Sequence, residues 1–265
     1  MVLKRIADNI WLICACRNLE TFRAMKGRLL GNGAGLRSLQ FRALERPVVY
    51  RPGTTDIFVA WELFRGREYA VGNAAWPFRT VVDCGANVGM FLAWVVANAG
   101  TPLERYVGIE ADESSFTTLQ RQLESLSLGS RYTILKAAVW KHDGEAYFDS
   151  TGPSWAHHVS ESGGQSVVAR TVKSILVESG IKQCDLLKLD IEGGELTVLP
   201  TIEQWGHMVR AIVAELHGGA DFAWFESTVE AAGFRAYPAG KLFRKHPGAL
   251  REDEIATFQR EGLLV

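Results

Sequence analysis

A glycine-rich turn between an apolar strand and an apolar helix constrains the fold of this chain more than any other feature. Residues 81–91 read Val-Val-Asp-Cys-Gly-Ala-Asn-Val-Gly-Met-Phe, and the apolar run that begins at Met90 continues to Ala99. This order predicts a buried strand, a tight turn and a helix. Glycine lets the backbone adopt positive φ and approach a ligand closely, and the first N–H groups of the helix suit anionic oxygen atoms. Such a unit is typical of a nucleotide or nucleoside site at the carboxyl edge of a parallel sheet.

The spacing of the glycines separates two classes of cofactor. A dinucleotide fingerprint, Gly-x-Gly-x-x-Gly, would start at Gly85 and continue with glycines where this chain has Asn87 and Met90. The closing glycine comes one position earlier, at Gly89. This pattern fits the Gly-x-Gly-x-Gly turn of S-adenosylmethionine sites better, with Asn87 accepting the left-handed conformation of the middle glycine.

A second predicted strand, residues 105–110, ends in an acidic side chain, Glu110. A carboxylate at this position accepts hydrogen bonds from both ribose hydroxyls, in nicotinamide sites and in S-adenosylmethionine sites alike. Glu110 therefore predicts a cofactor that contains ribose, without deciding which one.

The amino-acid composition limits the size of the core and the classes of partner that we expect. The 265 residues are 47% hydrophobic, enough for one large core with at most a small appendage. Basic and acidic residues nearly balance, 29 against 30, so we expect no nucleic-acid partner. No apolar run reaches the ~20 residues of a membrane span, and Asp8 interrupts the short apolar run near the start, so we expect no signal peptide. The four cysteines show no zinc spacing, which favours reduced thiols in a cytoplasmic protein.

The chain is predicted to form a helical cap over residues 1–75 and a second domain over residues 76–265. Apolar residues at helical spacing support the cap. In the second domain, strands and helices alternate, which predicts an α/β fold with a doubly wound parallel sheet. Further strands are predicted over residues 132–139, 184–190 and 209–217, helices over 112–126, 171–180, 194–205 and 222–232, and a hairpin over 234–238 and 242–245.

Residues 147–168 interrupt this alternation. They are rich in glycine, serine and proline and have no periodicity, and they include His157 and His158. We expect a long irregular segment here, and such segments in compact domains are usually functional.

Several blocks of the chain together resemble the FkbM family of S-adenosylmethionine-dependent methyltransferases. The similarity runs from about Val48 to Pro238 and is most specific in the Leu-Asp-Ile-Glu-Gly-Gly-Glu run at residues 189–195. The other blocks are residues 83–89, Glu-Leu-His at 215–217, and Arg-Pro-Gly-Thr-Thr-Asp at 51–56. The resemblance implies a class I methyltransferase (Rossmann-like) fold, a sheet of seven strands with an antiparallel last strand, and usually methylation of a hydroxyl on a sugar or secondary metabolite. The segment 152–158 departs from many relatives, which leaves the acceptor open.

The cofactor residues are predicted in the glycine turn and at the ends of the first four strands of the sheet. A methyl group on a sulfonium is already activated, so the enzyme chiefly aligns the acceptor and excludes water. The residues assigned to the cofactor are Asp83, Gly85, Asn87, Gly89, Glu110, Ala138 and Asp190.

A hydroxyl acceptor also needs a general base or a metal ion. We predict His217 as the base, because imidazole titrates near neutrality, with Asp190 beside it and His157 and His158 as further candidates. Asp190, Glu215 and His217 would also suit Mg²⁺ or Mn²⁺, although we do not expect metal dependence.

Other functions are also considered. The polar residues at the strand ends argue against a cofactor-binding module without catalysis. The glycine spacing argues against a nicotinamide oxidoreductase. N-methyltransferases of this fold often carry Asn/Asp-Pro-Pro-Tyr/Phe after the fourth strand, whereas this chain has Asp-Ile-Glu-Gly at residues 190–193. A small hydroxylated acceptor is therefore favoured. The sequence does not decide whether the cap forms a homodimer contact.

Overall fold

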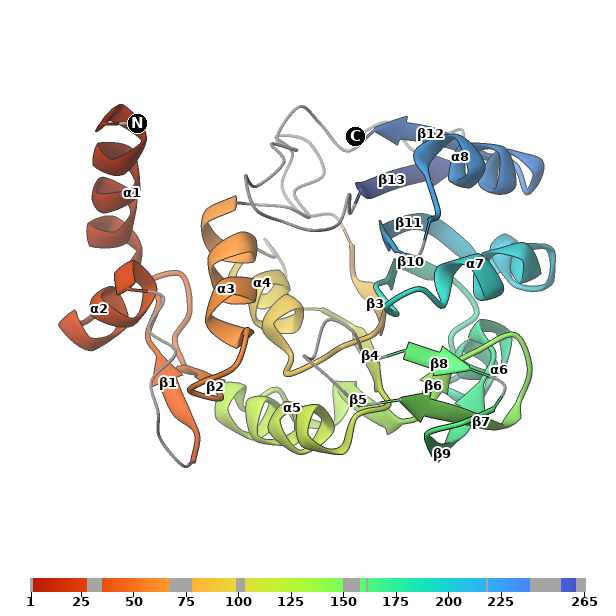
Figure 1. Ribbon diagram of the computed structural model, residues 1–265, viewed down its shortest axis with the longest axis horizontal. Coiled ribbons are helices and arrows are strands. Elements are labelled where there is room, and N and C mark those ends of the chain that lie inside the picture. Colours follow the sequence, from red (N-terminus) through yellow and green to blue (C-terminus); the bar gives the residue numbers. More distant parts are fainter. Residues whose placement is uncertain are drawn as a thin grey trace.

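The computed structural model describes residues 2–27, 35–66, 78–98, 103–149, 158–160, 162–217, 219–238 and 254–260. Its centre is a sheet of seven strands (Figure 1). They are β3 (Thr80–Cys84), β4 (Arg105–Glu110), β5 (Tyr132–Lys136), β10 (Cys184–Leu189), β11 (Val209–Leu216), β12 (Phe234–Pro238) and β13 (Glu254–Arg260).

The strand order across this sheet is β12-β13-β11-β10-β3-β4-β5. The pairs from β11 to β5 are parallel, whereas β13 is antiparallel to both β11 and β12. The predicted α/β fold with a central parallel sheet is confirmed. In this sheet β4 and β5 lie on one side of β3, and β10 and β11 lie on the other. The direction in which successive strands are added therefore reverses between β3 and β10. Ligands of open α/β sheets bind at such a switch point.

Helices cover both faces of the sheet because successive side chains of each strand point to opposite faces. Val81 and Leu186 belong to the core beneath α4, while their neighbours Val82 and Leu187 belong to the core beneath α6 and α8. The helical segments of this part are α4 (Met90–Asn98), α5 (Glu113–Leu126), η2 (Gly129–Arg131), α6 (Val172–Glu178), α7 (Glu195–Val198), η4 (Leu199–Gln204), η5 (Gly206–Met208) and α8 (Phe222–Ala231).

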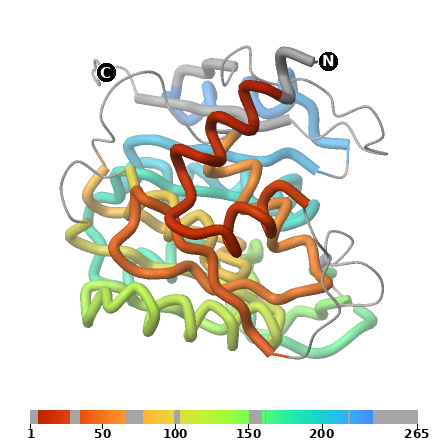
Figure 2. Tube along the Cα trace, turned by 90° about the vertical axis from the view of Figure 1, so that its left-hand side faces the viewer, coloured from red at the N-terminus to blue at the C-terminus, as the bar shows by residue number. Residues whose placement is uncertain are grey.

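The N-terminal region combines helices with a short hairpin. The described elements are α1 (Val2–Ala15), α2 (Leu19–Gly27), β1 (Arg37–Leu39), β2 (Val48–Tyr50), α3 (Asp56–Trp61) and η1 (Glu62–Gly66). Because β1 and β2 pair antiparallel, the region contains a short hairpin in addition to its helices. Leu12, Met25 and Ile57 lie in the same hydrophobic cluster as Phe91 and Trp94 of α4, so this region packs onto the sheet domain. Figure 2 shows α1 and α2 on the near side of the molecule.

The prediction of an irregular segment over residues 147–168 is wrong where the structure describes it. A second sheet of order β6-β9-β7-β8 is built from β6 (Ala138–Val139), β7 (Gly144–Asp149), β8 (His158–Ser160) and β9 (Gln165–Arg170). The strands are short and bury few side chains, which cluster around Trp140, Ala146 and Ala169. The apolar alternation that marks a half-buried strand is therefore weak here.

The C-terminal hairpin differs from its prediction. The first strand, β12, has the predicted bounds, but its partner β13 begins at Glu254. The predicted partner at residues 242–245 lies outside the described residues. Within the described residues, no helix combines the length and the apolar character needed to cross a membrane.

Candidate active site

The glycine turn packs directly against the end of β10. Gly85 and Gly89 both have φ of 82°, and Asn87 has the left-handed φ of 48° that the sequence predicted for it. A Cβ atom on Gly85 would lie 1.7 Å from the backbone oxygen of Asp190, and one on Gly89 would lie 2.8 Å from Cδ1 of Leu119. Gly85 therefore requires glycine for space as well as for backbone conformation, whereas at Gly89 the backbone conformation is the stronger reason, since a leucine side chain can shift.

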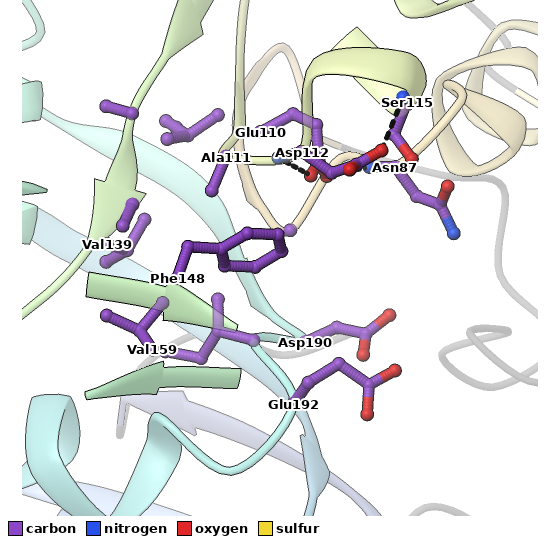
Figure 3. A pocket seen from close by; sticks show the side chains of 15 residues that line it. Asn87, Glu110, Ala111, Asp112, Ser115, Val139, Phe148, Val159, Asp190 and Glu192 are labelled. Carbon is purple, nitrogen blue, oxygen red and sulfur yellow. Dashed lines mark hydrogen bonds between the residues drawn. The ribbon is translucent and has the colours of Figure 1, made fainter. Parts of the chain in front are cut away.

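A pocket of about 690 Å³, counting the part open to solvent, lies at the carboxyl edge of the sheet beside this turn. One wall is apolar and includes Ile109, Val139, Phe148 and Val159. Figure 3 shows the ring of Phe148 projecting from the second sheet into the pocket. The sequence did not identify Phe148 or Val159, because their strands were not recognised.

Two groups of polar side chains lie at opposite ends of the pocket (Figure 3). Asn87, Glu110, Asp112 and Ser115 form one end, and Asp190 and Glu192 form the other. The predicted cofactor residues that line this pocket are Gly85, Asn87, Glu110, Ala138 and Asp190.

The carboxylate of Glu110 is oriented by two backbone groups. Its Oε2 accepts from the N–H of Asn87 at 2.7 Å, and its Oε1 accepts from the N–H of Asp112 at 2.8 Å. Burial raises the pKa of Glu110 to about 7, although these two hydrogen bonds oppose the shift. Each oxygen retains a lone pair for a further donor. The carboxylate can therefore accept from a pair of ligand hydroxyls.

Asp83, which was assigned to the cofactor, does not line the pocket. Its carboxylate is fully buried, accepts from the Tyr106 hydroxyl at 2.6 Å and lies 3.1 Å from Nζ of Lys188. Lys188 Nζ also lies 3.1 Å from Asp190 and donates to the Gly85 carbonyl at 3.0 Å. Burial would lower the pKa of Lys188, but Asp190 and Asp83 raise it overall, so its ammonium joins the turn to β10. Gly89 likewise supports the turn from outside the pocket lining.

The imidazole of His217 is buried among carboxylates behind the Asp190 end of the pocket. Nδ1 lies 3.3 Å from Glu195, and Nε2 lies 3.7 Å from Glu192 and 3.6 Å from Glu215. Burial opposes the charge, but the hydrogen bonds to Glu195 and Glu215 outweigh it and raise the pKa of His217 to about 12. At neutral pH the ring is therefore an imidazolium. It has no lone pair with which to accept a proton, so the geometry does not support the predicted role of a neutral base.

Glu192 is the side chain between this imidazolium and the pocket. Its backbone is left-handed, with φ of 52°, and it lines the pocket next to Asp190. Burial raises its pKa to about 8; the charge of His217 lowers it, and the neighbouring carboxylates raise it. The buried carboxylate of Glu195 accepts from the N–H groups of Ile191 and Gly193, which fixes the loop that carries Glu192.

The same end of the pocket offers donors for a metal ion. One ligand atom from each of Asp190, Glu192 and His217 lies within 4.8 Å of the other two. The predicted set had Glu215 in the position of Glu192. Two carboxylates and a neutral imidazole fit the preferences of Mg²⁺ or Mn²⁺, so an ion would bind here only by displacing a proton from His217. Of the two remaining predicted bases, His157 lies outside the described residues, and His158 is the first residue of β8.

Comparisons with known proteins identify one family. The family model described as Methyltransferase FkbM domain matches residues 83–245, more than half of the chain. A comparison with curated proteins gives no match. Among solved structures, methyltransferase FkbM from Methylobacillus flagellatus KT is similar at 16% identity and a TM-score of 0.49, over 71% of this chain and 45% of that one. The present chain thus spans less than half the length of that protein.

Two further structures are similar to the chain. The S-adenosylmethionine-dependent methyltransferase from Agrobacterium tumefaciens has 10% identity and a TM-score of 0.47, over 87% of this chain and 71% of that one. Magnesium protoporphyrin IX methyltransferase from Synechocystis PCC 6803, solved with bound S-adenosylmethionine, has 15% identity and a TM-score of 0.41, over 78% and 77%.

Proposed function

The chain belongs to the FkbM methyltransferase family, and from this premise we propose that it transfers the methyl group of S-adenosylmethionine to a hydroxyl of a small acceptor, a sugar or a secondary metabolite. One observation carries the proposal. A single pocket at the switch point of the sheet has a carboxylate suited to ribose at one end and a pair of acidic side chains, Asp190 and Glu192, at the other. The first end suits the nucleoside of the cofactor, and the second suits proton removal from an acceptor.

The residues of the pocket fit S-adenosylmethionine. Glu110 would accept from the ribose hydroxyls, and the apolar wall with Phe148 and Val139 would enclose the adenine ring. The methionine part would lie against the glycine turn, which lines the pocket at Gly85, with Asp190 as an acceptor for its ammonium group. The bound cofactor supplies an activated methyl group.

Glu192 is the proposed general base. A hydroxyl becomes a good nucleophile only when its proton leaves. Asp190 forms an ion pair with Lys188, and His217 is an imidazolium. Glu192 has a pKa of about 8, close to a working pH, so it is the carboxylate at this end that suits a general base. A divalent ion would be held by Asp190, Glu192 and His217 if it displaced the ring proton of His217, and it would supply Lewis-acid activation of the acceptor hydroxyl in place of the base.

The test of this function is a transfer assay on sugars and polyhydroxylated metabolites, run with and without EDTA. We expect an acceptor mass increase of 14 Da, the mass of one CH₂, together with adenosylhomocysteine release. Turnover that EDTA does not change supports Glu192 as a base that acts without a metal ion. Turnover that EDTA removes and that Mg²⁺ or Mn²⁺ restores supports a metal ion bound at this end of the pocket. Cofactor binding without transfer to any acceptor would instead indicate a binding module, and transfer to amines alone would refute the O-methyltransferase assignment.

Replacing Glu110 should weaken the cofactor complex. Glu110→Ala removes the acceptor for two hydroxyls in a buried place, so the affinity for adenosylhomocysteine should fall by about 2–3 kcal/mol, measured by calorimetry. Because the pKa of Glu110 is about 7, the wild-type affinity should also weaken as the pH falls from 8 to 6, when the carboxylate takes up a proton. Glu110→Ala should show no such pH dependence. Glu124→Gln, on the exposed side of α5, is the control. Unchanged affinity in Glu110→Ala would remove the ribose assignment.

A further inference from the structure

Arg51 connects the N-terminal region to the cofactor pocket. It follows β2, and its side chain is 16% exposed. The buried carboxylate of Asp56 accepts from Nε at 3.1 Å and from one terminal nitrogen at 2.8 Å, and it also accepts from the backbone N–H of Arg51 at 2.8 Å. This two-point pairing fixes the plane of the guanidinium.

The remaining N–H groups of Arg51 point to residues around the pocket. One terminal nitrogen donates to the hydroxyls of Ser114 and Ser115, both at 3.2 Å, and the other donates to the side-chain oxygen of Asn87 at 3.5 Å. With the two bonds to Asp56, all five donors of the guanidinium have an acceptor. Lysine offers three donors from a single atom and cannot reproduce this arrangement.

Two chains of hydrogen bonds lead from Arg51 to Glu110. On one side, Asn87 donates its backbone N–H to Oε2 of Glu110. On the other side, the N–H of Ser115 donates to Asp112 at 2.8 Å, and the N–H of Asp112 donates to Oε1 of Glu110. The guanidinium therefore contacts Asn87, which orients one oxygen of this carboxylate, and Ser115, which bonds to the residue that orients the other.

We propose that Arg51 is a positioning residue for the cofactor, which holds Glu110 in the orientation that accepts the ribose hydroxyls. The inference rests on the proposed role of Glu110. It gives the segment 51–56 a function that its distance in sequence from the glycine turn conceals. Arg51 acts through Asn87 and Ser115, so its effect should appear in cofactor binding and disappear when Glu110 is absent.

A double-mutant cycle tests this connection. Calorimetry with adenosylhomocysteine compares the wild type, Arg51→Ala, Glu110→Ala and the double variant. We expect Arg51→Ala to weaken binding at least about tenfold in the wild-type background and less than about twofold when Glu110 is already alanine. At saturating S-adenosylmethionine, kcat should stay within about twofold of wild type while KM for the cofactor rises, since Arg51 is assigned no contact with the acceptor.

The control is Arg65→Ala, which breaks the bond of Arg65 to Asp8 in the same N-terminal region without touching the pocket lining. It should leave cofactor affinity unchanged. Arg51→Lys repeats the cycle if Arg51→Ala does not fold. Wild-type affinity in the Arg51 variant, or an equal loss with and without Glu110, overturns the inference. Failure of the wild type itself to bind adenosylhomocysteine would instead refute the proposed function.

Discussion

Glu192→Gln should lower kcat by about 10²–10⁴, the usual contribution of a general base. The amide keeps the size of the side chain and removes its ability to take a proton from the acceptor hydroxyl. Cofactor affinity should hardly change, because Glu110 and Asp190 are assigned to the cofactor and Glu192 to the acceptor. The measurement is single-turnover methyl transfer with saturating S-adenosylmethionine, which isolates the chemical step from product release.

The pH profile gives an independent check on this assignment. Because the pKa of Glu192 is raised to about 8, the wild-type rate should rise with pH up to about 8 and then level off, as the carboxylate becomes ionised. Glu192→Gln should lose this dependence, and Glu203→Gln, at an exposed position of η4, should keep it. If His217→Asn abolishes turnover while Glu192→Gln stays near normal, the proton leaves through the imidazole and our assignment is wrong.

Gly85→Ala should abolish measurable cofactor binding. The added Cβ would lie 1.7 Å from the Asp190 oxygen, so the turn must move away from β10, and with it the main chain that the methionine part is proposed to approach. We expect an affinity loss of more than about 100-fold by calorimetry. In urea titrations the free energy of unfolding should also fall, by more than about 3 kcal/mol, because the backbone strain and the clash act together.

Gly233→Ala separates these two effects. Gly233 has φ of 80°, almost the value of Gly85, but no atom lies within 4 Å of the position that its Cβ would take. In Gly233→Ala the free energy of unfolding should fall by only about 1–2 kcal/mol, the cost of the left-handed backbone conformation for alanine. Equal losses in the two variants, with cofactor affinity retained in Gly85→Ala, would contradict the close packing of the turn on β10.

The parts of the site that the sequence predicted are those fixed by neighbouring residues. The turn follows from its glycines, and Glu110 follows from its place at the end of a strand. Asp112, at the start of the helix predicted over residues 112–126, caps α5, since its side chain accepts from the N–H of Ser115. In each case the signal and the structure lie within a few residues of each other.

The protonation state of His217 could not be predicted in this way. The imidazole alone suggested a base, but its charge depends on Glu195, Glu215 and Asp190, which β10 and β11 bring together only in the folded chain. The position of Asp83 was missed for a related reason. Nothing near it in the sequence shows that Lys188, from another strand, holds its carboxylate beneath the turn.

The second sheet supplies part of the pocket wall from outside the two large cores. Phe148 and Val159 reach the pocket from strands whose few buried residues form their own cluster around Trp140, Ala146 and Ala169. Exchanges of Phe148 and Val159 would leave the two large cores of the central sheet intact. Related enzymes can therefore diverge in what they admit to the pocket at little cost in folding, because evolution can vary the wall while it preserves the scaffold.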